Sequence, residues 1–356
     1  MALGRLHESA SVYQQALQFA VSQGEPLPAG TVDLYRGLSE LYCEWDDLDT
    51  AAHYLTTARE LGKQAALTGW QHRLGVAEAC RKEAQEDLEG ALALLDEAEH
   101  LYVESPLPNV RPIAALKARI WVMQGRLTEA LAWARERDLT VDGDLSYLRE
   151  FEFMIFARSL IVQYQNTGTA ETISEALSLL QRLLQAAEAG GRMGSVIEIL
   201  VLQAYGHAAR GNTTEALKSL ERALTLAEPE GYIRVFVGEG SLMAELLERI
   251  SGPGGRLKAY VHQLLAAFGR HKDARGPAIR PGSGQTPRTE PLVEPLSARE
   301  LEVLKLLGTE LSGPEIAREL VVSLSTVRTH TQAIYTKLGV NNRRTAIRRA
   351  EELNLL

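Results

Sequence analysis

The chain has 356 residues, of which 45% are hydrophobic and 24% charged, and its formal net charge is −8. This length allows two or three domains. The sequence lacks the run of about 18 apolar residues that a membrane-spanning helix needs, and the N-terminal Met-Ala-Leu-Gly-Arg-Leu-His-Glu lacks the apolar core of a signal peptide. We therefore expect a cytoplasmic protein with no membrane partner.

Residues 1–250 predict helices almost throughout, because alanine, leucine, glutamate and glutamine dominate. A short pattern recurs, as in Gly125-Arg-Leu-Thr-Glu-Ala-Leu-Ala and Gly211-Asn-Thr-Thr-Glu-Ala-Leu-Lys. Its small residue falls at Ser9, Ala51, Ala91, Ala130, Ala176 and Ala216, at intervals of 42, 40, 39, 46 and 40 residues. A small residue early in the second helix of a pair permits close packing, and such pairs bury their faces by stacking. The pattern predicts a tetratricopeptide-like helical-repeat solenoid.

Stacked helix pairs create a concave surface, and we expect an effector or a protein partner to bind there. Four aromatic residues are candidates for contacting it: Tyr35, Trp70, Trp121 and Tyr205. The alternative for each of them is ordinary packing between helices.

Residues 251–270 predict one closing helix, with apolar positions between Leu257 and Phe268. Residues 271–295 are rich in Gly, Pro, Arg and Ser and have no apolar periodicity, which is typical of a flexible linker. Basic residues in and beside this segment, Arg270, Lys272, Arg275 and Arg280, could contact DNA phosphates or simply keep the linker solvated.

Residues 296–356 predict four helices. Ser297-Ala-Arg-Glu300 and Ser312-Gly-Pro-Glu315 fit capping boxes that open the first two. A third helix follows a turn of three residues and runs to about Leu338, where Gly339 can end it. Two helices joined by so short a turn make a helix-turn-helix, whose second helix can enter the major groove of DNA.

The third predicted helix has two faces. Val327, Ile334 and Leu338 mark its buried face, and a polar set projects from the other side: Ser325, Arg328, Thr329 and Gln332. Arg328 suits guanine, Gln332 suits adenine, and the Thr329 methyl group can contact a thymine methyl. Five neighbours are candidates for contacting phosphates: Thr326, His330, Lys337, Arg343 and Arg344. The alternative is that these polar side chains only form a solvated helix face.

Several motifs together carry a specific resemblance: Leu296-Ser-x-Arg-Glu-x-Glu-Val-Leu304, Ser325-Thr-Val-Arg-Thr-His330 and Ile334-Tyr-x-Lys-Leu-Gly-Val340. They are similar to the LuxR-type DNA-binding domain. The resemblance implies a four-helix domain that binds double-stranded DNA, usually as a dimer, with base contacts from the residues at positions 328, 329 and 332. Glu310, Pro314 and Arg344 depart from the usual pattern. The promoter-reading region of sigma factors is a related alternative that the 334–340 motif disfavours.

The repeat body resembles that of large ATP-binding LuxR regulators of the MalT type, especially at Leu226-Ala-Glu-Pro-Glu-Gly-Tyr-Ile-Arg-Val-Phe236. That family normally carries an N-terminal nucleotide-binding module. The sequence contains no Gly-x-x-x-x-Gly-Lys-Ser/Thr motif to hold a triphosphate. We therefore expect either the C-terminal part of such a regulator or a naturally shortened member.

Charge is distributed unevenly along the chain. Residues 295–356 hold nine Lys and Arg against seven Asp and Glu, a net charge of +2, whereas the remainder carries −10. This division is typical of a regulator whose body does not contact DNA.

No residue pattern predicts an enzyme, a metal site or a cofactor. His7-Glu8 lacks the second histidine of a zinc helix, and Cys43 and Cys80 have no metal-ligand spacing. The sequence predicts an all-α transcriptional regulator whose repeat body senses an effector. Double-stranded DNA, RNA polymerase and further copies of the chain are its expected partners. The alternative is a protein-binding scaffold in which the helix-turn-helix serves assembly.

Overall fold

We describe the fold from a computed structural model of the chain. It describes residues 3–24, 28, 30–65, 69–102, 109–250, 256–275, 298–307, 309 and 313–320, together with 327, 331, 334, 337, 347, 349 and 350. These residues belong to two compact units, 1–278 and 279–356, and each unit is described by itself. The described part of the chain is helical and contains no strand, which confirms the predicted all-α class.

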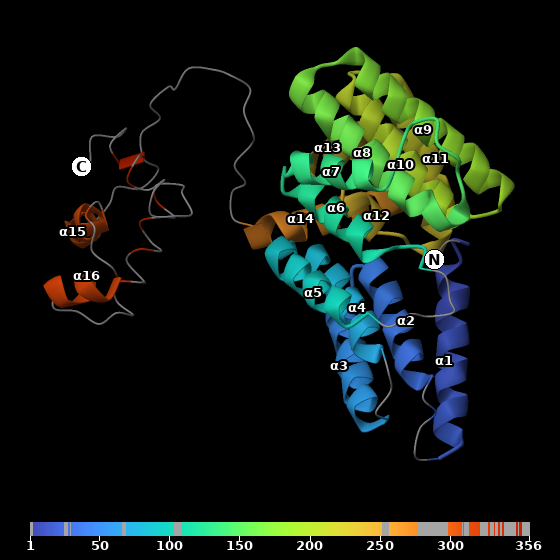
Figure 1. Cartoon of the computed structure of the whole chain (residues 1–356), viewed down its shortest axis with the longest axis horizontal. Helices are drawn as coiled ribbons and strands as arrows, with labels where there is room; N and C mark the ends of the chain where they lie inside the picture. The colour runs from blue at the N-terminus through green and yellow to red at the C-terminus, as the bar shows by residue number, and fades with distance from the viewer. Residues whose placement is uncertain are drawn as a thin grey trace. The chain divides into compact units, whose positions relative to one another are not determined.

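The first unit is built from antiparallel helix pairs (Figure 1). A single helix, α1 (Leu6–Ser22), precedes them. The pairs are α2 (Thr31–Glu44) with α3 (Leu48–Ala65), α4 (Trp70–Ala84) with α5 (Leu88–His100), α6 (Ile113–Met123) with α7 (Leu127–Glu136), α8 (Glu150–Thr167) with α9 (Ala170–Ala189), and α10 (Met193–Ala209) with α11 (Thr213–Ala227). Two short 3-10 helices, η1 (Tyr147–Arg149) and η2 (Glu228–Glu230), lie before α8 and after α11.

The small residues of the repeat lie where their helices approach most closely. Ala51, Ala91, Ala130 and Ala216 are each the fourth residue of the second helix of a pair, and their side chains are fully buried. Ala176 is equally buried but stands seven residues into α9, which accounts for the longer interval before it. The packing therefore confirms the predicted repeat register at these five positions, whereas Ser9, on the single helix α1, is only half-buried.

The turn within a pair also has a repeated conformation. The residue five positions before the buried alanine has a positive φ, of 62° at Asp46, 66° at Glu86, 76° at Gly125 and 81° at Gly211. A left-handed residue directly after a helix lets the chain reverse into the next one. Glycine adopts this conformation at no steric cost, whereas Asp46 must be held there by its surroundings.

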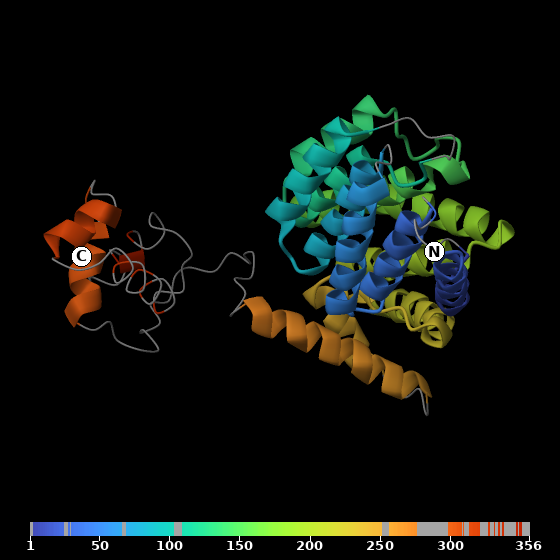
Figure 2. The ribbon, with the colours of Figure 1, turned by 90° about the horizontal axis from the view of Figure 1, so that it is seen from below.

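Three helices complete the first unit: α12 (Arg234–Val237), α13 (Ser241–Arg249) and α14 (Arg256–Arg275). Figure 2 shows α14 along one side of the repeat body. It packs there through Tyr260, Val261, Leu264 and Phe268, which belong to the same hydrophobic core as the repeats. The helix runs to Arg275, so the linker predicted for 271–295 was placed too early at its start; its residues after 275 lie outside the described ones. No described helix is long and apolar enough to cross a membrane.

The second unit contains α15 (Ala298–Leu307) and α16 (Gly313–Glu319). Further described positions, Val327, Thr331, Ile334 and Lys337, are helical at a spacing of three or four residues. Val327 and Ile334 are buried with residues of α15, α16 and Ala350 in a separate small core. The buried face predicted for the third helix is therefore present where the structure describes it.

Candidate functional site: a charged cavity and the second unit

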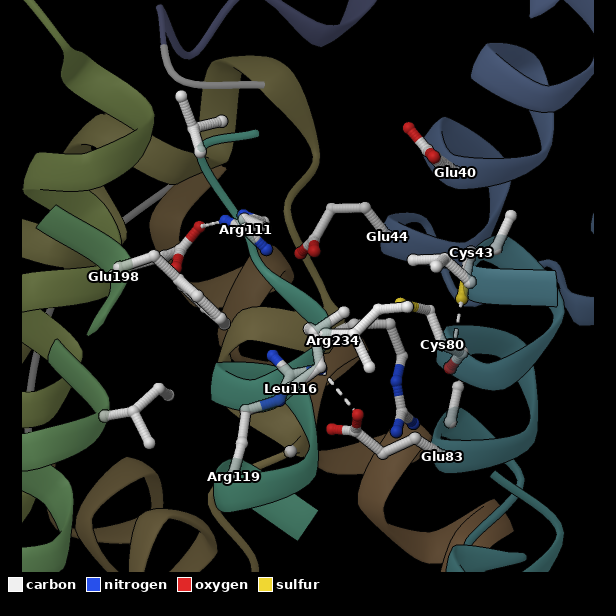
Figure 3. A pocket seen from close by; sticks show the side chains of 18 of the residues that line it. Glu40, Cys43, Glu44, Cys80, Glu83, Arg111, Leu116, Arg119, Glu198 and Arg234 are labelled. Atoms are coloured by element: carbon white, nitrogen blue, oxygen red, sulfur yellow. Dashed lines mark hydrogen bonds and ion pairs between the residues drawn. The ribbon is translucent and has the colours of Figure 1, made fainter. Parts of the chain in front are cut away.

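The first unit encloses a cavity of about 650 Å³. Its walls come from the first helix of each pair, α2, α4, α6, α8 and α10, and from residues of and next to α12 (Figure 3). The first helices turn one face to their partner and another to the inside of the solenoid. The cavity therefore lies on the inner side of the repeats, where the sequence predicted an effector site.

Arginine and carboxylate side chains dominate the polar part of this lining. Most of them form ion pairs between different segments of the chain: Arg73 with Asp33 at 2.9 Å, Arg119 with Glu83 at 2.5 Å, Arg158 with Glu239 at 2.7 Å, and Arg111 with Glu198. Burial is the largest single influence on Arg158 and lowers its pKa, but the attraction and hydrogen bonds of Glu239 together outweigh it and raise the pKa. Arg158 therefore stays charged although it is buried.

One inward-facing position recurs through the repeats. Glu40, Cys80, Arg119, Arg158 and Glu198 all line the cavity, at sequence intervals of 40, 39, 39 and 40 residues. These intervals match the repeat period. Charged side chains recurring at the period of an otherwise buried helix face are the signal from which the site could have been predicted.

The aromatic residues predicted to contact an effector do not line this cavity. Trp70 is only 8% exposed and packs with Tyr35 in a small core beside α3 and α4, and Trp121 and Tyr205 pack against the main core. The burial and packing of these side chains favour the packing alternative. The cavity wall instead contains Tyr102 and Phe151, and the Phe151 ring lies 4.8 Å from the Arg111 guanidinium.

A single carboxylate, Glu44, reaches the cavity without an arginine partner among the described ion pairs. One of its oxygens, Oε1, accepts a hydrogen bond of 3.0 Å from the backbone N–H of Val235. Burial raises the pKa of Glu44 to about 7, against the opposing influence of that hydrogen bond. This carboxyl group therefore changes its charge near neutral pH.

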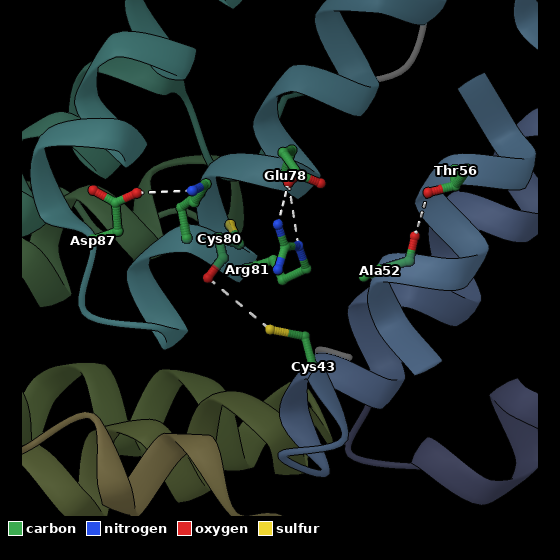
Figure 4. Close-up of polar contacts among 8 residues, drawn as sticks. Cys43, Ala52, Thr56, Glu78, Cys80, Arg81 and Asp87 are labelled. Carbon is green, nitrogen blue, oxygen red and sulfur yellow. Dashed lines mark hydrogen bonds and ion pairs between the residues drawn. The ribbon is translucent and has the colours of Figure 1, made fainter. Parts of the chain in front are cut away.

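Both cysteines also line the cavity. The Cys43 thiol points at the backbone oxygen of Cys80, with Sγ 4.0 Å from that oxygen (Figure 4). Burial raises the pKa of Cys43 to about 12 and that of Cys80 to about 11. Both groups are therefore protonated thiols under ordinary conditions.

The thiols should consequently resist modification in the folded protein. At pH 8 we expect each to react about 100-fold or more slowly with a disulfide reagent than after unfolding in urea, because thiolate is the reactive form. Mass spectrometry of the labelled chain counts the modified cysteines, and the variants Cys43→Ser and Cys80→Ser separate the two. Rapid labelling of the native chain would contradict the raised pKa values of the two thiols.

The second unit offers a different kind of site. Within the described residues, the Thr331 hydroxyl donates to the backbone oxygen of Val327 at 2.8 Å, and Lys337 is helical and partly buried. The other predicted contacts lie outside the described residues: Ser325, Arg328, Thr329 and Gln332 for bases, and Thr326, His330, Arg343 and Arg344 for phosphates. In the described part of the chain, no group of three His, Cys, Asp or Glu side chains is placed to hold a metal ion.

Comparison with known proteins identifies both units. Residues 1–252 match the model of the MalT-like TPR region, and residues 294–350 match that of bacterial regulatory proteins of the luxR family. A protein named HTH-type transcriptional regulator MalT from Klebsiella pneumoniae is 28% identical over 76% of this chain, and its namesake from Serratia proteamaculans is 28% identical over 90%. The matches cover 30% and 36% of those proteins, so the chain spans about a third of the length of the curated relatives it matches.

Proposed function

This chain belongs to the family of proteins with a MalT-like TPR region, and from that premise we propose that it is a DNA-binding transcriptional regulator. The observation that carries the proposal is the luxR-family match over 294–350, which includes the whole predicted recognition helix. The burial of Val327 and Ile334 supports it, because a helix that buries this face leaves positions 325, 328, 329 and 332 on its other sides.

The proposal divides the chain into a repeat domain at 1–250, a closing helix, a linker up to residue 295 and a DNA-binding domain at 296–356. The repeat domain senses an effector, and the charged cavity is the place for it, since it combines concave shape with a few converging polar groups. The regulator acts in the cytoplasm, where it has access to DNA and to RNA polymerase.

The protein itself supplies no chemical step in this proposal. The protein acts by recognising DNA. Arg328 and Gln332 can each form two parallel hydrogen bonds with one base, and basic residues around them position the domain by binding phosphates. Because the DNA-binding domain carries a net charge of only +2, non-specific attraction to DNA is weak and the base contacts matter more.

Arg328→Ala tests the assignment of the base-reading face. We expect the variant to lose about 1–3 kcal/mol of affinity for the operator, and to discriminate less at a single base pair. Electrophoretic mobility shifts with operator and with random DNA measure both effects. The matched control is Arg59→Ala, which removes one exposed arginine from α3 and should leave DNA binding unchanged. Equal losses on operator and random DNA would reduce Arg328 to a phosphate contact.

A further inference from the structure

The repeat domain is closed on itself by a contact between distant parts of the chain. The turn after α2, residues 44–46, meets residues 230–235 near η2 and α12; we call this contact the clasp. The backbone N–H of Ile233 donates to the backbone oxygen of Glu44 at 3.1 Å, and the indole N–H of Trp45 donates to the backbone oxygen of Glu230 at 2.9 Å. Contacts between segments nearly 190 residues apart join the first helix pair to the end of the repeats.

Asp46 extends the clasp to α14. Its side chain is only 3% exposed, and its carboxylate lies 3.3 Å from the Arg234 guanidinium and 2.9 Å from the Arg270 guanidinium. Arg270 belongs to α14, the last helix of the unit before the chain continues toward the DNA-binding domain. These ion pairs offset the conformational cost of the positive φ at Asp46.

Glu44 connects the same turn to the cavity. Its Oε1 accepts the hydrogen bond from the backbone N–H of Val235, which belongs to the clasp. The same side chain lines the cavity. The charged and titratable groups that act on it come from every side: Arg234 of α12, Arg111 before α6, Glu198 of α10, Cys43 of α2, and the Tyr232 and Tyr260 hydroxyls. A hydrogen-bond donor placed in the cavity can reach the second oxygen, which has no ion-pair partner among the described residues.

We propose that the clasp couples the cavity to α14: a ligand that donates a hydrogen bond to Glu44 keeps the clasp closed, and an ionised Glu44 without such a donor favours its opening. The inference rests on the proposed function in taking the cavity as the effector site. The ligand class it names is a molecule that presents a hydroxyl, amide or ammonium donor to a buried carboxylate.

A change of pH can replace the unidentified effector as a probe. Protonation of Glu44 removes the negative charge that, in the proposal, favours opening of the clasp. Glu44 binds a proton more tightly in the closed clasp, where its pKa is about 7, than in an open, hydrated one, where the ordinary value of 4.5 applies. The closed form therefore holds more protons, and its stability is full below pH 4.5 and falls as pH rises to 7. Between pH 6 and pH 8 the ratio of open to closed clasp should rise about tenfold.

Hydrogen–deuterium exchange of the full chain, corrected for the intrinsic pH dependence of exchange, measures this opening. In the wild type, amides of 256–270 in α14 should exchange about tenfold faster at pH 8 than at pH 6. Glu44→Gln keeps an acceptor for Val235 but cannot ionise, so its corrected rates should be equal at the two pH values. His7→Gln is the control for histidine titration, since the His7 ring stacks on Trp45 with centroids 5.2 Å apart; it should retain the tenfold change.

A second pair of variants tests the link to α14 directly. Asp46→Asn should speed exchange in 256–270 about tenfold at pH 6 and leave α9 unchanged, because it weakens both ion pairs. Asp49→Asn removes an exposed carboxylate three residues away and should have no effect. If Asp46→Asn behaves like Asp49→Asn, or if Glu44→Gln keeps the pH dependence, the coupling is refuted. These measurements use no DNA and no effector, so their failure is distinct from a failure of Arg328→Ala to impair operator binding.

Discussion

Replacing Arg158 by alanine should lower the free energy of unfolding by about 3–5 kcal/mol, because it leaves a buried carboxylate without its partner. The Glu239 side chain is 6% exposed and that of Arg158 14%, and a hydrogen bond of 2.7 Å joins Nη1 to Oε2. Solvent cannot replace the lost guanidinium at such a site. Urea unfolding of the full chain, followed by circular dichroism, measures the change.

An exposed ion pair in the same domain provides the control. Lys218 lies 3.7 Å from Glu215 on α11, and their side chains are 78% and 45% exposed. Lys218→Ala should cost less than about 1 kcal/mol, since water screens and replaces such a pair. If the two variants are destabilised equally, the cavity lining is hydrated and the burial of its ion pairs has no energetic consequence.

DNA carrying two half-sites should bind the full chain about 10²–10⁴-fold more tightly than DNA with one. The reason is effective concentration: if repeat domains associate, the second DNA-binding domain binds in an intramolecular step. Helix-turn-helix dimers read half-sites about one helical turn apart. Fluorescence anisotropy with one-site and two-site duplexes gives the two affinities.

The spacing of the half-sites provides the control for this prediction. Adding about five base pairs between them rotates one site to the opposite side of the duplex, and most of the gain should remain if the linker is flexible as predicted. Equal affinity for one-site and two-site DNA would show that the chain binds as a monomer, and would contradict the expectation that further copies of the chain are its partners on DNA.

The repeat architecture could be predicted from sequence because its determinants are local and periodic. A small residue at the start of each second helix, as at Ala130 and Ala216, recurs at the repeat length, and both side chains are fully buried. The recognition helix was predictable for a similar reason, since its buried positions Val327 and Ile334 follow helical spacing.

The clasp could not be predicted in this way. Closure depends on how the small rotation between successive pairs accumulates, and this brings Trp45 to Glu230 without any matching pattern in the two segments. The positions of the aromatic residues were not predictable either, because size alone does not distinguish a cavity wall from core packing. Trp70 packs in a small core beside α3, whereas Phe151 belongs to the main core and also lines the cavity.

Selection from fragmented genomic DNA tests the central claim most directly. The purified full chain is mixed with the fragments, and the bound ones are recovered and sequenced, in parallel with a variant that carries both Arg328→Ala and Gln332→Ala. If Arg328 and Gln332 recognise bases, the wild type should enrich fragments that share a short sequence motif. The double variant should lose that motif while circular dichroism shows that it remains folded. Recovery of the same motif by both proteins, or of no motif by the wild type, would contradict the account.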